Sequence, residues 1–597
     1  MEIALVGIGV SPGIAIGPAL AFDVRTLEIP RYAIVDTSEE LARFDAARDS
    51  VRKDLERLYE QTAQELGKRH ADIFQAHLML LDDVTVRDEI VERLEQEKVN
   101  VEYLIDDLVT KYTKTLETVD DPRFRERTND LLDVSSRILG RLLKTEFKTL
   151  EHLGRPSIVV AHDLSPSDTA KIDIANALGI VTDLGGPTSH TAILTRALEI
   201  PAVVGLKYAG VHVVPGDTLI VDGASGKVVI RPSEETLAQF TEEKKRTEEK
   251  RQALLLAERD RPSVTLDGVG IPVMANIELP VEISHSVKVN AQGVGLYRTE
   301  YLFLNRNSLP SEEEQYHAYS QVAAALNPAS VTLRTLDLGG DKFASHLELA
   351  PEINPQLGWR GIRFCLERPD VFKAQLRAML RASVHGNVQI MFPMISGIEE
   401  LRGVKRMLDE VKNDLEMREI PFNKDIKIGS MIEVPSAVIV ADLLAEECDF
   451  FSIGTNDLIQ YSLAVDRVNE KIAHMYEPAH PAVLRMLQRT VDMATTAGIP
   501  CSICGEMAGD PLFTELLLGL GVDSLSMAPV AIPVIRAQIS GIRLPLARRF
   551  AKRVLAATTV SEVRALLQQR HERRIAAEMH VARPSDSSRS ESPSFWE

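Results

Sequence analysis

Charged and polar residues follow directly after short apolar runs in the second half of the chain. Two of them, Glu433 and Asp457, are carboxylates that could bind one Mg²⁺ together, because this ion takes oxygen ligands and keeps open positions for water and substrate. Arginines stand at similar places, and a guanidinium makes paired hydrogen bonds to phosphate or carboxylate. The full set comprises Arg298-Thr299-Glu300, Asp337 to Lys342, Glu433, Asn456-Asp457 and Cys504-Gly505-Glu506, with Arg334 inside the third run and Arg360 and Arg467 on following loops. Such a set is typical of a site for a small, highly charged phosphorylated acid.

Two of these observations have simpler explanations that the residues alone leave open. Any single arginine is more often part of a surface ion pair, and only the shared position of the arginines favours a substrate site. Cys504 ends a CxxC motif that begins at Cys501, but the chain has no second cysteine pair for a structural zinc and no thioredoxin-like context. A buried, unreactive thiol would explain this motif equally well.

A second candidate centre is the sequence Gly185-Gly186-Pro187-Thr188-Ser189-His190-Thr191. Two glycines and a proline predict a tight turn, Thr188 and Ser189 can cap the helix that follows, and His190 then lies in its first turn. Backbone N–H groups and the helix dipole favour an anion there, so an imidazole at this place could carry phosphate. A histidine in a capping loop is more often structural, and the motif by itself does not decide.

The apolar runs that precede the first set alternate with segments of helical length. About eight such units in roughly 260 residues predict a (β/α)8 barrel, whose active site lies at the C-terminal ends of its strands. The predicted strands are residues 271–277, 293–297, 331–338, 388–394, 426–432, 450–453, 500–503 and 524–527. All the groups of the first set would then meet at one end of one barrel.

The sequence of the first part of the chain predicts two other kinds of structure, a helical bundle and a set of short strands. Residues 36–149 carry apolar side chains mostly at helical spacing, which indicates an antiparallel helical bundle. Short β-type runs separated by Gly and Pro follow, at residues 157–160, 202–204, 218–221 and 227–230. The strands expected within residues 1–22 have no partner of their own, so we expect them to pair with these later runs, with the bundle inserted into one α/β domain.

Composition limits the classes of function. The chain has 597 residues and a formal net charge of -19, which disfavours nucleic acid and anionic lipid as partners. Four cysteines are too few for a disulfide framework and suit a reducing cytosol. The apolar stretch near the N-terminus has Glu2 in place of a basic leader and is broken by Gly and Pro, so we expect neither a signal peptide nor a membrane helix.

Taken together, these motifs resemble enzyme I of the bacterial phosphoenolpyruvate-dependent sugar phosphotransferase system. The resemblance covers the chain up to about residue 570 and rests on the sequence around His190 and on GVGLYRTE, TLDLGGDK, PQLGWRGIR, IMFPMI, MIEVPSA, FFSIGTNDLIQY and CGEMAGD. It implies a multidomain α/β fold, in which a swivelling phosphohistidine domain with an inserted helical bundle precedes a (β/α)8 TIM-type barrel. The implied domains are a phosphohistidine domain (1–22 and 150–231), a helical domain that binds the phosphocarrier HPr (36–149), a charged helical linker (232–262), a phosphoenolpyruvate-binding and dimerisation barrel (263–575) and a disordered tail (576–597).

The same resemblance implies roles for individual residues. His190 would be the phosphorylated nucleophile, reacting through Nε2, and Cys504 the acid that protonates the enolate to give pyruvate. Thr169 and Arg196 would lie beside the phosphorylated His190. The implied phosphoenolpyruvate ligands are Arg298, Arg334, Asn456, Asp457 and Arg467, assisted by Arg360 and Lys342, and the implied Mg²⁺ ligands are Glu433 and Asp457.

The implied activity takes phosphate from phosphoenolpyruvate and passes it to a histidine of HPr as the first step of sugar uptake. Residues 72–81 resemble the part of enzyme I that docks HPr, and we expect a cytoplasmic homodimer joined through the barrel. Two rival hypotheses remain. A regulatory phosphoprotein would serve a signalling carrier, but nitrogen-related paralogues usually begin with a sensory domain that is not seen here. A dikinase would need a large ATP-grasp domain, for which the chain has neither the length nor the Gly-rich loops.

Overall fold

In the computed structural model, the chain forms two compact units. The main boundary between them along the chain lies within one long helix, between Thr247 and Glu248. The structure describes residues 2–22, 29, 31–65, 77–78, 80–81, 84–117, 134–135, 138–143, 150, 153, 155–164, 172–173, 175–186, 190–207, 209–278, 282–303, 308–339, 352, 354–467, 469 and 472–581. Each unit is described by itself.

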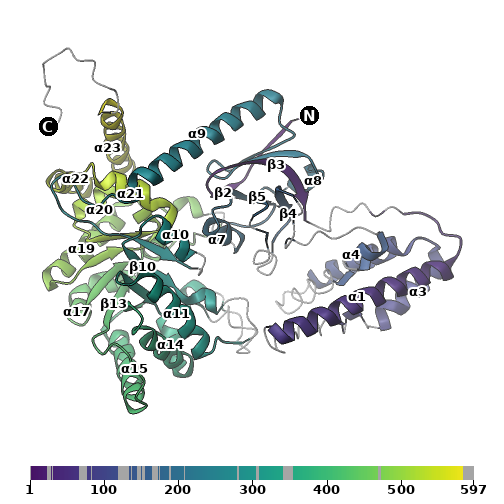
Figure 1. Ribbon diagram of the computed structural model, residues 1–597, viewed down its shortest axis with the longest axis horizontal. Helices are drawn as coiled ribbons and strands as arrows, with labels where there is room; N and C mark the ends of the chain where they lie inside the picture. Colours follow the sequence, from purple (N-terminus) through teal and green to yellow (C-terminus); the bar gives the residue numbers. More distant parts are fainter. Residues whose placement is uncertain are drawn as a thin grey trace. The chain divides into compact units, whose positions relative to one another are not determined.

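The second unit contains a closed barrel of eight strands, all of them parallel to their neighbours (Figure 1). The strands are β9 (Val273–Ile277), β10 (Gly293–Arg298), β11 (Ser330–Arg334), β12 (Asn387–Phe392), β13 (Lys427–Ile432), β14 (Phe450–Ile453), β15 (Cys501–Ile503) and β16 (Ser524–Met527). They are short and mostly apolar, as expected of parallel strands covered on both faces. The predicted (β/α)8 architecture is confirmed, and each predicted run overlaps one observed strand.

The third strand is shorter than the sequence predicted. Residues 331–338 were expected to form one strand, but β11 ends at Arg334. Beyond it, the N–H of Leu336 donates to the Gln375 side chain and that of Asp337 donates to Glu300 Oε1, both at 2.9 Å. Buried polar side chains therefore replace the neighbouring strand as hydrogen-bond partners, and the chain turns away from the barrel wall.

Helices follow the barrel strands and cover their outer side (Figure 1). Their apolar faces are buried, whereas the opposite faces carry the charged residues, which is the usual pattern of barrel helices. The α-helices of this unit after the long helix are α10 (Glu282–Lys288), α11 (Glu312–Leu326), α13 (Ile362–Glu367), α14 (Pro369–Ala382), α15 (Ile398–Met417), α16 (Pro435–Ile439), α17 (Ala441–Ala445), α18 (Thr455–Leu463), α19 (Pro481–Ala497), α20 (Thr514–Leu520), α21 (Ile532–Ile539), α22 (Leu544–Ala556) and α23 (Val560–Val581).

The first unit contains a mixed sheet of eight strands in the order β1-β8-β7-β3-β4-β5-β6-β2. The strands are β1 (Ile3–Val6), β2 (Ile8–Ser11), β3 (Ile14–Ala21), β4 (Ser157–Ala161), β5 (Ala177–Thr182), β6 (Ala202–Val204), β7 (Thr218–Asp222) and β8 (Lys227–Ile230). All three N-terminal strands pair with strands that follow the helical segment: β1 with β8, β2 with β6, and β3 with both β4 and β7. The central strand β5 was not predicted, because Gly179 and the flanking loops conceal its short apolar run.

Three long helices lie between β3 and β4 in the sequence. They are α1 (Thr37–Glu65), α3 (Val84–Glu97) and α4 (Val101–Glu117), and they pack around a common apolar core that includes Phe44, Leu55, Leu94 and Leu104 (Figure 1). Two shorter helices, α7 (His190–Ala197) and α8 (Ala209–His212), accompany the sheet. The bundle predicted over residues 36–149 is helical in its described part.

The charged segment 233–261 forms the predicted long helix, α9 (Glu234–Glu258). Near its start, Phe240 packs against Ile220 and Val229 of the mixed sheet. Its last residue, Glu258, belongs to a different environment, because the guanidinium of Arg536 in α21 donates to the Glu258 carbonyl at 2.6 Å. The helix is thus packed against one unit at its beginning and held by the other at its end.

Arg536 is fully buried, and its guanidinium is surrounded by backbone carbonyls. Besides Glu258 it donates to Arg259 at 3.2 Å, to Val289 at 3.1 Å and to Asn290 at 2.7 Å. These carbonyls lie at the ends of α9 and α10, where the helix dipole favours a cation. One arginine therefore fixes two helix ends on the barrel.

The end of the chain departs from the expected disordered tail. Helix α23 continues to Val581, so residues 576–581 are helical, because the run Ala576-Ala577-Glu578-Met579 favours the continuation of a helix. The Ser-rich part, 582–597, lies outside the described residues. Among the described helices none is alone long and apolar enough to cross a membrane, and one pair, Pro529–Ile539 with Leu544–Ala556, passes this test only in combination across a bend of 106°.

Candidate active site

Arg334, the last residue of β11, lies buried between two carboxylates. Its Nη2 donates to Glu300 Oε1 at 3.0 Å, and its Nη1 lies 3.1 Å from Asp337 Oδ2. Burial raises the pKa of Glu300, whereas for Asp337 the opposing effect of burial is outweighed by Arg360 and Arg334, which hold its pKa below the usual value. The Nε of Arg334 is buried and has no hydrogen-bond partner among the described residues, so it remains for a ligand.

Arg360 reaches the same carboxylate from the loop before α13. Its Nε and Nη2 donate to Asp337 Oδ1 and Oδ2 at 3.1 and 2.9 Å, and Nη2 also donates to Asp457 Oδ2 at 3.1 Å. The next residue, Gly361, has φ +57° and ψ −131°, a conformation that side chains rarely tolerate. A Cβ at Gly361 would lie only 3.0 Å from Asp337 Oδ1. The glycine therefore lets this loop approach closely enough for Arg360 to bind Asp337.

Three buried carboxylates meet at this end of the barrel. Asp337, Glu433 after β13 and Asp457 in the first turn of α18 each offer an oxygen, and these oxygens all lie within 4.8 Å of one another. Burial, followed by the charges of Asp457 and Asp337, raises the pKa of Glu433 to about 8. Oδ1 of Asp457 is buried without a hydrogen-bond partner among the described residues. An all-oxygen set whose mutual repulsion is only partly offset by Arg334 and Arg360 fits a divalent cation such as Mg²⁺, Mn²⁺ or Ca²⁺.

Cys504 follows β15 directly and is buried at the same end. Burial raises the pKa of its thiol to about 11, so the thiol keeps its proton at neutral pH. Its Sγ lies 3.6 Å from the carbonyl oxygen of Ile453, the last residue of β14. A buried, protonated thiol beside a cluster of arginines is suited to give a proton to a carbanion or enolate.

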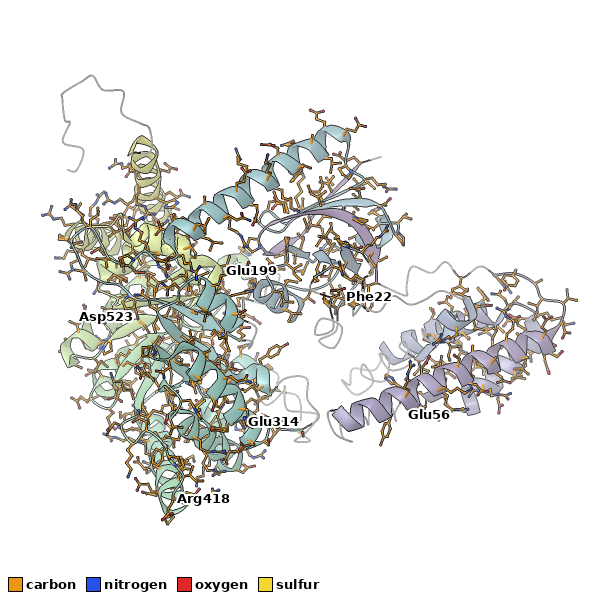
Figure 2. All side chains as sticks on the ribbon, in the orientation of Figure 1. Phe22, Glu56, Glu199, Glu314, Arg418 and Asp523 are labelled. Atoms are coloured by element: carbon orange, nitrogen blue, oxygen red, sulfur yellow. The ribbon has the colours of Figure 1, made fainter. Side chains whose placement is uncertain are left out.

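Cys501 occupies the opposite end of the same strand. It is the first residue of β15, and its N–H donates at 2.8 Å to Asp523, which is labelled in Figure 2 and precedes β16. Residues i and i+3 of an extended strand have Cα atoms about 10 Å apart. A disulfide usually requires about 4.4–6.8 Å, so the two thiols cannot pair without movement of the backbone.

Two further predicted ligands, both arginines, belong to the cluster. Arg298 ends β10 and forms an ion pair with Glu278, and Arg467 Nη2 lies 3.5 Å from Asp457 Oδ1. Their side chains are 33% and 30% exposed, against 11% for Arg334 and 10% for Arg360, so two arginines are fixed inside the barrel end and two face the opening.

Asn456 offers a neutral donor beside these arginines. Its Oδ1 accepts the N–H of Glu506 at 3.0 Å, which leaves its amide NH₂ as a donor for a ligand. The cluster can thus bind one small molecule through several cations and an amide while carboxylates hold a metal beside it.

Known proteins of similar sequence match most of this chain. Three family profiles match it: "PEP-utilising enzyme, N-terminal" over residues 6–127, "PEP-utilising enzyme, mobile domain" over 153–226, and "PEP-utilising enzyme, PEP-binding domain" over 252–544. The "Phosphoenolpyruvate-protein phosphotransferase" of Bacillus sp. (strain S) is 42% identical over 559 residues, which cover 93% of this chain and 96% of that protein. The chain belongs to the phosphoenolpyruvate-protein phosphotransferase family.

Other members of this family match over a similar length. The protein of the same name from Bacillus subtilis (strain 168) is 41% identical over 571 residues, covering 95% of this chain and 99% of that protein. The one from Haemophilus influenzae is 40% identical over 566 residues, covering 94% and 98%. Identity at this level spans both the mixed-sheet unit and the barrel, so the similarity to the phosphotransferase family is not confined to one of the two units.

The histidine motif of this phosphotransferase family member lies in the first unit. Gly185 has φ +108°, as the predicted tight turn requires, and His190 is the first residue of α7. Arg196 lies exposed in the last turn of the same helix. The side chain of His190, together with Thr169, Lys342 and most of residues 72–81, lies outside the described part of the chain, and the roles predicted for these residues stay predictions.

Sequence reasoning found the arginines of the site but not the groups that hold them. Glu300 and Asp337 stood in the quoted motifs without a role, and Tyr461 was not considered. The hydroxyl of Tyr461 donates to the Gln356 carbonyl at 2.6 Å and accepts from Arg360 Nη1 at 3.2 Å. A signal was present, because buried arginines require nearby carboxylates, and Glu300 and Asp337 are the acidic residues that closely follow β10 and β11.

Proposed function

We propose that this chain takes the phosphoryl group of phosphoenolpyruvate onto His190 and passes it to a histidine of the phosphocarrier HPr, releasing pyruvate, as the first step of sugar uptake. The observation that carries the proposal is the group of arginines, carboxylates and one protonated thiol at the C-terminal ends of the barrel strands. Phosphoenolpyruvate has the matching chemistry, since it combines a phosphate, a carboxylate and a carbon that must receive a proton.

The binding step uses the cations of the barrel end. Arg298, Arg334 and Arg467, with the amide of Asn456, would hold the phosphate and carboxylate of phosphoenolpyruvate, and Arg360 and Lys342 would assist. Glu433 and Asp457 would hold Mg²⁺, which supplies charge neutralisation at the phosphoryl group when it is bound. Arg334 and Arg360 are buried and fixed, so they can hold the phosphoryl group in one orientation during transfer. Losing one such preorganised donor commonly costs roughly 10²- to 10³-fold in rate.

The transfer step forms one bond and breaks another. Nε2 of His190 attacks phosphorus, the bond between phosphorus and the enol oxygen breaks, and the enolate of pyruvate remains at the barrel end. Cys504 then gives its proton to the terminal carbon of this enolate, which yields pyruvate, and the thiolate recovers a proton from water. A pKa of about 11 suits this role, because the thiol is protonated at neutral pH when the enolate forms.

The domain roles belong to the same proposal. Residues 1–22 and 150–231 would carry the phosphohistidine, with Thr169 and Arg196 beside it, residues 36–149 would bind HPr, and 232–262 would link them to the barrel of residues 263–575, which would form a homodimer. The mixed sheet formed by the discontinuous first segment and the single long helix α9 support this division.

One assay tests the proposal. The full chain is incubated with Mg²⁺ and either labelled phosphoenolpyruvate or labelled ATP, and label is followed onto the chain and then onto purified HPr. We expect acid-labile label from phosphoenolpyruvate only, and its transfer to HPr. Label from ATP would favour a dikinase, and label that reaches a signalling carrier but not HPr would favour a regulatory phosphoprotein.

A further inference from the structure

Asp337 stands in the buried carboxylate group together with Glu433 and Asp457, yet its oxygens are used differently. Oδ1 accepts from Arg360 Nε, and Oδ2 accepts from Arg360 Nη2 and lies 3.1 Å from Arg334 Nη1. Both oxygens of Asp337 are therefore already bound by guanidinium groups. A metal ion at these oxygens would have to displace two arginines.

Each of the other two carboxylates keeps one oxygen without a hydrogen bond from a described residue. Glu433 Oε1 accepts the N–H of Met394 at 2.7 Å, whereas its Oε2 forms no hydrogen bond with a described residue. Asp457 Oδ2 accepts from Arg360, and its Oδ1 is the buried atom that has no hydrogen-bond partner among the described residues. Glu433 and Asp457 thus each keep one oxygen without a hydrogen bond from a described residue, although Arg467 Nη2 lies 3.5 Å from Asp457 Oδ1. Asp337 differs from them, because both of its oxygens accept hydrogen bonds from Arg360.

The backbone around Asp337 is itself fixed. Its N–H donates to Glu300 Oε1 at 2.9 Å, and the same oxygen accepts from Arg334. Two residues further along, Gly339 forms an isolated β-bridge with Arg360, so the two loops that carry the acid and the arginine are joined through the backbone as well. Asp337 therefore cannot shift toward a metal without disturbing both arginines.

We propose that Asp337 is a positioning residue for phosphoryl transfer: it holds Arg334 and Arg360 in one fixed arrangement, and it is not a ligand of the metal. The inference rests on the proposed function, because the two arginines act on the substrate named there. Asp337 itself acts through them.

The test uses the full chain and a variant that keeps the charge. Asp337→Asn would leave two buried guanidiniums short of a carboxylate and would destabilise the barrel. Asp337→Glu retains the carboxylate but moves it by one methylene, and a displacement of this size can cost about 10²-fold in rate when it misplaces catalytic groups. The matched control is Glu515→Gln, since Glu515 binds Arg570 through both oxygens at 2.7–3.0 Å outside the strand-end cluster.

Two measurements separate the possible roles. Binding of Mn²⁺ alone is measured by calorimetry, and kcat and KM are measured for pyruvate formation from phosphoenolpyruvate. For Asp337→Glu we expect Mn²⁺ affinity within about twofold of the unmodified chain and a loss of about 10²-fold in kcat/KM, mostly in kcat. For Glu433→Gln we expect more than tenfold weaker Mn²⁺ binding, as for loss of a metal ligand. Glu515→Gln should lower the melting temperature and leave both quantities unchanged.

Two results would overturn the inference. The first is Asp337→Glu with normal kcat/KM, because the arginines would then not depend on this carboxylate. The second is a loss of Mn²⁺ affinity in Asp337→Glu equal to that in Glu433→Gln, because Asp337 would then be a metal ligand. If the unmodified chain forms no pyruvate from phosphoenolpyruvate, the proposed function fails instead, and the Mn²⁺ measurement still decides the division of the carboxylates.

Discussion

The barrel end and the turn before α7 differ in how far apart in the sequence their residues lie. At the barrel end, side chains from strands and loops far apart in the sequence bind one another, as Arg360 binds both Asp337 and Asp457. At α7, the motif is local: a glycine turn and the first residue of one helix. A site assembled from many segments can fix a substrate in three dimensions. A local motif can be carried by a small domain, which suits the proposed transfer of phosphate by His190 from phosphoenolpyruvate to HPr.

Removal of His190, the histidine of the local motif, should have the most severe effect. His190→Ala should abolish acid-labile, base-stable labelling by phosphoenolpyruvate, because no other residue is expected to accept the phosphate. Circular dichroism should remain unchanged, since a residue at a helix start contributes little to a core. The matched control is His212→Ala, which removes the exposed last residue of α8 in the same unit and should label normally. Full labelling of the His190 variant would exclude it as the acceptor.

The two units that carry these sites can also be separated by cleaving the chain. A cut in α9 near Arg251 should yield two folded pieces, because each unit has its own core. The N-terminal piece should be a monomer that exchanges phosphate with phosphorylated HPr but cannot use phosphoenolpyruvate. The C-terminal piece should dimerise and bind phosphoenolpyruvate with Mg²⁺. Sedimentation and transfer assays check this, and an N-terminal piece that is phosphorylated directly by phosphoenolpyruvate would contradict the division.

Within the barrel, Cys501 at the start of β15 and Cys504 directly after its end should differ in their roles. Cys504→Ala should slow pyruvate formation roughly 10²- to 10⁴-fold, the usual value of a positioned general acid. Binding of phosphoenolpyruvate, measured by calorimetry, should survive. Cys501→Ala changes a thiol at the other end of the strand and should be nearly neutral in rate. Equal losses in both variants would indicate a structural or redox pair instead.

The mildest of these effects is a pH dependence of metal binding at the carboxylate group. Because burial raises the pKa of Glu433 to about 8, a proton competes with the metal below that pH. Apparent Mn²⁺ affinity should fall up to roughly tenfold for each pH unit below 8, with about one proton released on binding at pH 7. A metal affinity independent of pH between 6 and 8 would contradict this pKa.

The raised pKa of Glu433 also makes the stability of the fold depend on pH. The folded, metal-free chain holds this proton more tightly than the unfolded chain, whose glutamate has the ordinary pKa of 4.5. The contribution of Glu433 to stability is therefore fully present below pH 4.5 and is lost as the pH rises toward 8.

Much of the architecture could be predicted because each barrel strand is an apolar run between polar loops. The exact end of β11 could not, since it depends on Glu300 and Gln375 capturing two N–H groups from other segments. β5 was missed for a related reason: its short run is marked as a strand mainly by its neighbours β4 and β6.

The candidate site shows the same limit. Residue types and their place after strands were enough to select the arginines and the two carboxylates that are proposed to bind the metal. Which carboxylate binds arginine and which is left for a metal depends on the direction of individual oxygens, as at Asp337. Such pairing is tertiary information that no local spacing contains.

Helix α9 has a further consequence for motion. Phe240 packs near its start and the Arg536 guanidinium binds its last carbonyl, but residues 241–249 between them are exposed apart from the partly buried Glu243. This middle stretch is held mainly by hydrogen bonds within the helix, and such stretches open locally at a small fraction of the free energy of global unfolding. Its amide hydrogens should therefore exchange with solvent much faster than those at either end, and the chain can bend there without unfolding either unit.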